Sequence, residues 1–305
     1  MRAEDSSERS EITAVVGRMS HGITVVVIAY HGHLDLSRSL APLRGALPVL
    51  VVDNSSDPLV RQVAAEQSAA YLDPGTNLGF GAGVNYALAH GVDVRHDVLL
   101  LNPDAVIDAR DVTALHVALR SDRKIAALSP ALAYPDGSSQ RVAWPFPSPF
   151  RALLEACGLG GRLVRHQDFV IGAVLMLSRE ALSVVGGFDE SFFLYAEETD
   201  WQRRATQHGY QARVLESITA QHAGGGTSSD EVRREVFFQA GQERYIRKWF
   251  GVRGWQCYRV SVLLGSLLRS YAGPTEKRGT ARRRVRLLLE GPARRAAVIR
   301  SLAPE

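Results

Sequence analysis

The chain has 305 residues, which is enough to bury a full hydrophobic core in one large domain or two smaller ones. Hydrophobic residues make up 46% and charged residues 22%, an ordinary balance that excludes a wholly disordered chain. The two cysteines, Cys157 and Cys257, lack the spacing of a metal site or a disulfide framework, so a reducing cytoplasm fits best.

The charge is distributed unevenly along the chain. The net charge is +4, but Gly251–Glu305 carries 12 Lys and Arg against 3 Asp and Glu. This basic tail predicts an anionic partner, either a membrane surface or another polyanion. Packing of the tail on the rest of the protein, or on a partner in a homodimer, is the alternative. The first 21 residues are polar without an apolar core, which predicts a disordered leader and argues against a secretory signal.

Strands and helices are predicted to alternate along the first half of the chain. Apolar, β-branched runs predict strands at 23–30, 48–52, 70–72 and 98–101, with helices at 34–43, 60–68, from the glycine-rich stretch to residue 90, and at 111–120. This alternation is typical of a mostly parallel α/β sheet covered by helices on both faces. In such sheets ligands bind at the carboxyl ends of the strands.

The second half is less regular. It predicts strands at 126–133 and 169–177, a loop near the site at 134–150, and helices at 179–185, 197–208 and 232–250. Basic helices should follow to the end of the chain, broken at Gly273-Pro274 and Gly291-Pro292. No stretch reaches the roughly 20 apolar residues that span a bilayer.

Polar side chains follow several predicted strands. Asp53 and Asn54 could bind a nucleobase or ribose, or cap the next helix. The stretch Gly79–Gly83 lacks the G-x-G-x-x-G order, so it is either a flexible helix entry or a close backbone approach to a phosphate. Asp104 could anchor a divalent ion, because phosphate oxygens and water can complete the shell, or it could simply close a turn.

The acidic segment Phe188–Trp201 is the hardest to explain by local structure. Glu197, Glu198 and Asp200 follow several aromatic residues, and helix capping does not need so many acids. Carboxylates beside aromatic rings suit a general base positioned against a sugar hydroxyl, with rings stacked on sugar faces. His222 precedes a glycine loop and is either structural or a ligand to Mn²⁺ or Mg²⁺.

Taken in order, these segments resemble bacterial family-two glycosyltransferases, and they look most like the rhamnosyltransferase and galactofuranosyltransferase branch. The likeness rests on Val26–Tyr30, Val51–Asp57, Asn77–Phe80, Leu100–Asp104, Gly172-Ala173 with Arg179, Gly186–Trp201 and His222. It implies a GT-A fold over residues 22–250, with a mostly parallel, Rossmann-like sheet flanked by helices. The basic helical extension would then occupy residues 251–305.

The resemblance also implies roles for individual residues. Asp104 and His222 would hold Mn²⁺ or Mg²⁺, and Glu198 stands where the family has its catalytic base, with Glu197, Asp200 or Asp189 as alternatives. Asn102 replaces the first acid of the family's Asp-x-Asp motif, and Glu198 replaces an aspartate. The expected donor-nucleotide site comprises Ala29, Tyr30, Asp53, Asn54, Asn77, Gly79, Asn85 and Asn102, and the expected acceptor site comprises Gly172, Ala173, Asp189, Tyr195 and Trp201.

The implied reaction is inverting, metal-dependent transfer of a sugar from a nucleotide-diphosphate donor, either dTDP-rhamnose or a UDP-sugar. The implied acceptor is a cell-envelope or lipid-linked glycan. We expect no nucleic-acid partner, and a cytoplasmic enzyme held at the inner face of the plasma membrane by its basic tail. One alternative is a nucleotidyltransferase that makes the sugar nucleotide, although residues 31–35 lack its basic, glycine-rich phosphate loop. The other is a non-catalytic, membrane-associated glycan-binding protein on the same fold.

Overall fold

The computed structural model describes residues 22–160, 167–224, 231–272 and 274–302, so the expected leader lies outside the described residues. Two compact units emerge from the contacts within the chain. The sheet unit comprises the chain up to Trp144, Asp168–Ser191 and Glu198–Ser229. The helical unit comprises Pro145–Gln167, Phe192–Glu197 and Asp230–Glu305.

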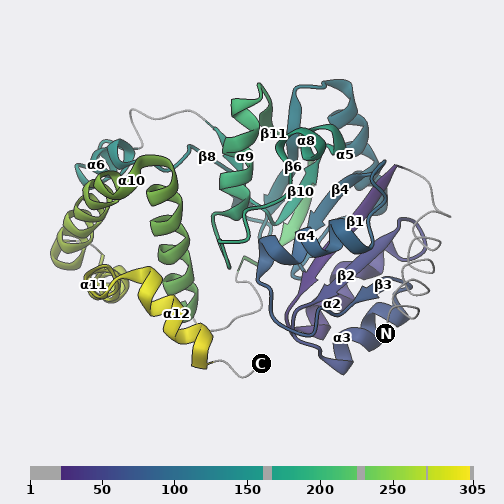
Figure 1. Ribbon diagram of the computed structural model, residues 1–305, viewed down its shortest axis with the longest axis horizontal. Coiled ribbons are helices and arrows are strands. Elements are labelled where there is room, and N and C mark those ends of the chain that lie inside the picture. The colour runs from purple at the N-terminus through teal and green to yellow at the C-terminus, as the bar shows by residue number, and fades with distance from the viewer. Residues whose placement is uncertain (1–21, 161–166, 225–230, 273, 303–305) are drawn as a thin grey trace. The chain divides into compact units, whose positions relative to one another are not determined.

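The sheet unit is built on one mixed sheet with the strand order β3-β2-β1-β4-β10-β6-β11-β5, and β7 pairs with β6 (Figure 1). The strands are β1 (Ile23–Ala29), β2 (Val49–Asp53), β3 (Ala70–Leu72), β4 (Asp97–Leu101), β5 (Ala105–Val106), β6 (Ile125–Ala133), β7 (Ser139–Gln140), β10 (Val174–Leu177) and β11 (Gln211–His222). Strands β3, β2, β1 and β4 are parallel to one another, whereas β10 lies between β4 and β6 and is antiparallel to both. A separate antiparallel pair joins β8 (Ala143–Trp144) to β9 (Phe169–Val170).

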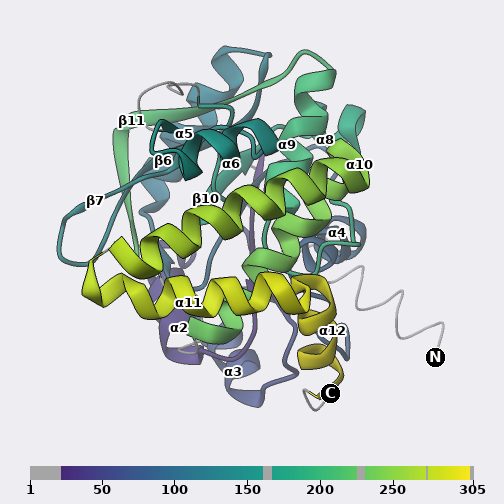
Figure 2. The same ribbon diagram turned by 90° about the vertical axis from the view of Figure 1, so that its left-hand side faces the viewer.

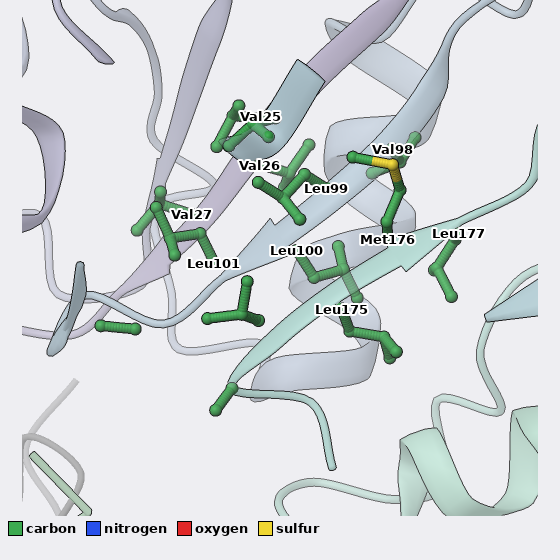
Figure 3. Close-up of a cluster of buried hydrophobic side chains, with 14 of the residues drawn as sticks. Val25, Val26, Val27, Val98, Leu99, Leu100, Leu101, Leu175, Met176 and Leu177 are labelled. Carbon is green, nitrogen blue, oxygen red and sulfur yellow. The ribbon is translucent and has the colours of Figure 1, made fainter. Parts of the chain in front are cut away.

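Helices flank this sheet, as the alternating sequence pattern predicts. They are α2 (His33–Leu40), the short 3-10 helix η1 (Ala41–Leu43), α3 (Pro58–Glu66), α4 (Phe80–His90), α5 (Ala109–Ser121), α8 (Arg179–Val185) and α9 (Glu197–Gln207). Strands β1, β4 and β10 form the centre of the core, where Val25–Val27 and Leu99–Leu101 are at most 1% exposed (Figure 3). A strand that is covered on both faces has a continuous run of apolar residues, and this is why these strands could be predicted from the sequence.

Two predicted elements differ from the structure. The expected strand at 169–177 is split into β9 and β10, because Ile171 N–H bonds the Val142 carbonyl while the Ala173 carbonyl accepts from Asn102 N–H. The expected loop at 134–150 contains the short strands β7 and β8, and helix α6 (Pro149–Ala156) begins at its end. Both differences depend on pairing with distant segments, which the local pattern does not show.

The helical unit contains α6, α10 (Glu231–Ala272), α11 (Thr275–Glu290) and α12 (Pro292–Leu302). Helix α10 continues past residue 250 through a kink at Gly251, whose φ of 68° is non-helical. The predicted breaks at residues 273–274 and 291–292 are confirmed, since α11 follows Pro274 and α12 starts at Pro292. Figure 2 shows the second half of α10 lying beside α11. Across the part of the chain that the structure describes, no helix is long and apolar enough to cross a bilayer.

Candidate active site

The turn after β4 lies against the segment that leads into β10. Asn102 N–H donates to the Ala173 carbonyl at 2.9 Å, and the Asn102 carbonyl accepts from Ala105 N–H at 3.0 Å. The antiparallel pairing of Val174 with Leu101 continues this contact into the sheet. The structure therefore brings the residues Asn102–Asp104 next to Gly172 and Ala173.

Glu198 lies in the first turn of α9 and contacts the other side of the same segment. Its carboxylate accepts hydrogen bonds from the backbone N–H groups of Gly172, Thr199 and Glu198 itself. A Cβ on Gly172 would lie 3.7 Å from Glu198 Cγ, an ordinary van der Waals distance, so Glu198 packs directly against this segment. Burial raises the pKa of the Glu198 carboxyl above its ordinary value, although the three amide hydrogen bonds oppose the shift.

Gln202 lies one turn further along α9 and connects this helix to the segment that contains Gly172. Its side-chain amide bonds both backbone groups of Val170, with Oε1 accepting from Val170 N–H at 2.9 Å and Nε2 donating to the Val170 carbonyl at 2.8 Å. Nε2 also donates to the Glu198 carbonyl at 3.1 Å. The side chain is buried, so these partners replace water. The sequence pattern does not reveal Gln202, and only its spacing of four residues from Glu198 hints at this role.

Asp104 and His222 face each other at the ends of neighbouring strands. His222 ends β11 and pairs with Ala105 of β5, which places its Nε2 atom 3.5 Å from Asp104 Oδ1. The two side chains are only 9% and 5% exposed. His222 Nδ1 lies 2.9 Å from Gln140 Oε1, so an N–H on Nδ1 leaves the lone pair on Nε2. Gln140 comes from the expected loop near the site and was not predicted.

This pair fits a divalent metal ion. A histidine that donates its second nitrogen to an oxygen is held in the orientation common among metal ligands. Within the described ranges, no group of three or more His, Cys, Asp and Glu side chains forms a complete metal cage. The pair could supply one oxygen and one nitrogen ligand, and an ion that bridges phosphates needs only one or two protein ligands.

Asp53 shapes the loop that follows β2. The carboxylate is fully buried and accepts from Ser55 N–H and Oγ, from Asp57 N–H at 2.8 Å, and from the Tyr71 hydroxyl at 2.9 Å. Burial, together with the bond to Asp53, raises the pKa of Tyr71 to about 12. The helix cap of α3 is Asp57, which accepts from Leu59 N–H, so Asp53 does not cap the helix directly.

The ends of β1 and β2 are tied to the start of α4. Asn54 N–H bonds the Ala29 carbonyl, and Asn54 Nδ2 donates to the Gly79 carbonyl, both at 2.9 Å. Asn77 Oδ1 accepts from Gly79 N–H at 3.0 Å. Gly79 has φ 82° and ψ −172°, a conformation that side chains disfavour. These contacts gather the expected donor residues at one edge of the sheet, where the partly exposed Tyr30 follows β1.

Asn85 has a different set of partners. Its Nδ2 donates to the Phe188 carbonyl and to Glu190 Oε1, both at 2.9 Å, and its Oδ1 accepts from Phe188 N–H at 2.8 Å. A Cβ on Gly187 would lie 2.5 Å from Asn85 Oδ1, so that glycine is needed for the close approach. The structure therefore ties the Asn85 amide to the loop after α8, and its role at the nucleotide stays a prediction.

Two expectations from the acidic segment are wrong. Trp201 is fully buried, stacks on Phe188, and donates from Nε1 to the Gly186 carbonyl at 2.8 Å, so its ring cannot face a sugar. Asp200 is also fully buried and pairs with Arg204 Nε at 3.1 Å. The Arg204 guanidinium also donates to the Val185 and Gly187 carbonyls, so both residues fix α9 to the preceding loop.

The remaining acidic and aromatic residues differ in their surroundings. Asp189 is partly exposed and accepts from Ser191 N–H at 3.0 Å. Tyr195 and Glu197 belong to the helical unit. Tyr195 has a left-handed φ of 68°, and its carbonyl lies so close to α10 that a Cβ on Gly241 would be 2.5 Å away. Glu197 is 4% exposed.

The sequence is similar to known glycosyltransferases, although no family model matches it. It is 26% identical over 229 residues to the low-salt glycan biosynthesis hexosyltransferase of Haloferax volcanii, which covers 72% of each chain. It is 28% identical over 236 residues to the N-acetylglucosaminyl-diphospho-decaprenol L-rhamnosyltransferase of Mycobacterium tuberculosis, covering 67% of this chain and 76% of that relative.

Solved structures show the same fold. A mannosyltransferase from Pyrobaculum calidifontis, in complex with GDP-Man and Mn²⁺, superposes with a TM-score of 0.57 at 15% identity, covering 98% of this chain and 93% of that chain. Glucosyl-3-phosphoglycerate synthase from Mycobacterium tuberculosis, in complex with phosphoglyceric acid, gives 0.52 at 17% identity, covering 79% and 83%. The sequence relatives are glycosyltransferases and the solved structures share the GT-A fold, so this chain is a glycosyltransferase, and it is most similar in kind to the rhamnosyltransferase-like branch of family two.

Proposed function

We propose that this glycosyltransferase works with inversion, using Glu198 as the general base toward a hydroxyl of a glycan acceptor. The observation that supports this role is the position of the Glu198 carboxyl, held by the Gly172 amide beside the turn that carries Asp104. A general base works best when its pKa lies near the operating pH, and burial raises the pKa of Glu198 in that direction.

In the proposed reaction, the acceptor hydroxyl attacks the anomeric carbon of the donor while Glu198 accepts its proton. The bond between the anomeric carbon and the diphosphate oxygen breaks, and the diphosphate leaves with the electron pair. One displacement inverts the anomeric configuration. The Gly172 and Thr199 amides hold the carboxylate in place, which reduces the motion needed to reach the hydroxyl.

Asp104 and His222 are the proposed metal ligands, and the ion is Mn²⁺ or Mg²⁺. A bound ion would neutralise charge on the nucleotide diphosphate. The nucleotide is proposed to bind where the ends of β1 and β2 meet α4, against the partly exposed Tyr30 and Asn77, while the buried Ala29, Asp53, Asn54 and Gly79 hold this edge in shape. Two hydrogen bonds connect the turn after β4 with the proposed base. Asn102 N–H donates to the Ala173 carbonyl, and the neighbouring Gly172 N–H donates to the Glu198 carboxylate.

The name of the mycobacterial relative describes rhamnose transfer to a lipid-linked N-acetylglucosamine. We propose by this likeness that the donor is dTDP-rhamnose or a UDP-sugar and that the acceptor is a lipid-linked or other cell-envelope glycan. Such an acceptor would place the enzyme at the inner face of the plasma membrane.

The test is transfer by the full chain from a panel of sugar nucleotides, including dTDP-rhamnose, UDP-sugars and GDP-mannose, with Mn²⁺ and a diphospholipid-linked N-acetylglucosamine. Glu198→Gln should lower turnover about 10²- to 10⁴-fold, the usual contribution of a general base, while donor binding measured by thermal shift is retained. Glu66→Gln is the matched control, since Glu66 is an exposed residue of α3 that bonds Gln62.

Three results would contradict the proposal. Near-normal turnover of Glu198→Gln would remove Glu198 as the base. Consumption of a nucleoside triphosphate in place of a sugar nucleotide would favour the nucleotidyltransferase. Glycan binding without transfer from any donor would favour the non-catalytic alternative.

A further inference from the structure

The second half of α10 presents large apolar side chains to solvent. Val260, Leu264, Leu267, Leu268 and Tyr271, here called the α10 stripe, are 53%, 51%, 41%, 61% and 79% exposed. Their spacing of three and four residues puts them on one face of the helix. Continuous exposed apolar faces of this kind mark an interaction surface, whereas single exposed apolar residues do not.

The opposite side of the same helix packs within the helical unit, through the apolar residues Val262 and Leu263 and through small residues. Ser261, Gly265, Ser266 and Ser270 are buried, and a Cβ on Gly265 would lie 3.3 Å from the Ala156 Cα atom of α6. A helix that only covers a protein core buries its large apolar residues and exposes its polar ones. Here a second set of large apolar residues is exposed on the other side, so packing within the described part of the helical unit does not explain the stripe.

Exposed arginines lie on the neighbouring helix. Figure 2 shows α11 running beside this part of α10, and Arg259 Nε of α10 donates to the Leu288 carbonyl of α11 at 2.8 Å. Arg282, Arg283 and Arg286 are exposed at spacings that share one face of α11. Apolar and cationic side chains therefore line two adjacent helices, in a region where basic residues outnumber acidic ones by 12 to 3.

We propose that this surface docks on an anionic lipid bilayer. The α10 stripe would enter the boundary between headgroups and acyl chains, and the α11 arginines would bind lipid phosphates. A second copy of the chain fits less well, because a twofold contact through this surface would bring arginines of both copies together. The surface adds a partner to the proposed transfer reaction and does not depend on the donor or acceptor.

The experiment is co-sedimentation of the full chain with vesicles of phosphatidylcholine alone or mixed with phosphatidylglycerol, at about 50 mM and about 500 mM salt. The protein should bind the mixed vesicles, more weakly at high salt. Leu264→Gln combined with Leu268→Gln should weaken binding about tenfold or more through lost apolar burial. Arg282→Gln combined with Arg286→Gln should do the same through lost phosphate contacts and should reduce the salt dependence.

The matched control is Val94→Gln combined with Val117→Gln, because these sheet-unit valines are 88% and 65% exposed. This control should sediment like the wild type. Absence of wild-type binding to the mixed vesicles at low salt would overturn the proposal, and so would stripe variants that bind like the wild type. A wild-type dimer that the stripe variant converts to a monomer, without vesicle binding, would assign the surface to a second copy instead. Transfer to a water-soluble acceptor without lipid should be unchanged in the stripe variant, so failure of docking is separable from failure of the transfer reaction.

Discussion

The hydrogen bonds between the Gln202 side chain and the Val170 backbone lead to a prediction of stability whose size can be worked out. Gln202→Leu keeps most of the side-chain volume but leaves the buried N–H and carbonyl of Val170 without their partners. Each buried backbone group left unsatisfied costs about 1–3 kcal/mol, so we expect a loss of about 3 kcal/mol in the free energy of unfolding of the sheet unit. That loss corresponds to a melting temperature lower by about 6–12 °C.

The same change should affect the pH dependence of transfer. Val170 precedes Gly172 by two residues, and the Gly172 amide bond lowers the pKa of Glu198. Loosening this segment weakens the bond, so the acid limb of the rate profile should move to higher pH. Gln62→Leu is the control, because Gln62 is exposed on α3 and bonds only Glu66 among the side chains of that helix. This reasoning would be refuted if the free energy of unfolding of Gln202→Leu lay within about 1 kcal/mol of the wild-type value and the acid limb of its pH–rate profile did not move.

Three further predictions concern the same unit. The wild-type kcat/KM should fall as the pH drops through the raised pKa of Glu198, because only the ionised carboxylate can accept a proton, and a limb centred at or below 4.5 would contradict this. Gln140→Ala should raise the Mn²⁺ concentration for half-maximal activity about 10- to 100-fold, since Gln140 orients His222, and an unchanged Mn²⁺ titration would speak against His222 as a ligand. Asn85→Ala should lower the free energy of unfolding, measured with denaturant, by about 2 kcal/mol, because two hydrogen bonds to Phe188 are lost, and nucleotide binding should stay intact. Weakened nucleotide binding with unchanged stability would favour the expected nucleotide role instead.

Much of the sheet could be predicted from the sequence because its central strands are buried on both faces. The runs 25–29 and 98–101 are apolar throughout, and few other structures bury such runs at this length. The turn Asn102–Asp104 could be placed at a strand end for the same reason. The break between β9 and β10 could not, because the residues 171–173 are apolar or small and only pairing with Val142 and Asn102 interrupts the strand.

The acidic segment shows where the sequence alone is insufficient. Successive residues at the start of a helix point in directions about 100° apart, so the acids of α9 cannot share one environment. Packing decides that Asp200 meets Arg204 and that Trp201 enters the core, whereas the Glu198 carboxyl meets the Gly172 amide. Neither the pattern of acids nor their number contains this information.

The sequence by itself determined the class of the fold and the order of the motifs, because these depend on local apolar runs and on residue types at strand ends. The family resemblance named Asp104 and His222, but it is the tertiary structure that brings their side chains together. Only the tertiary structure decided which partners complete the site, since Gln140 and Gln202 reach His222 and Val170 across 82 and 32 residues of sequence. It also decided that the apolar residues of the α10 stripe are exposed. The helical period shows that they share a face, but whether a face is buried depends on what packs against it.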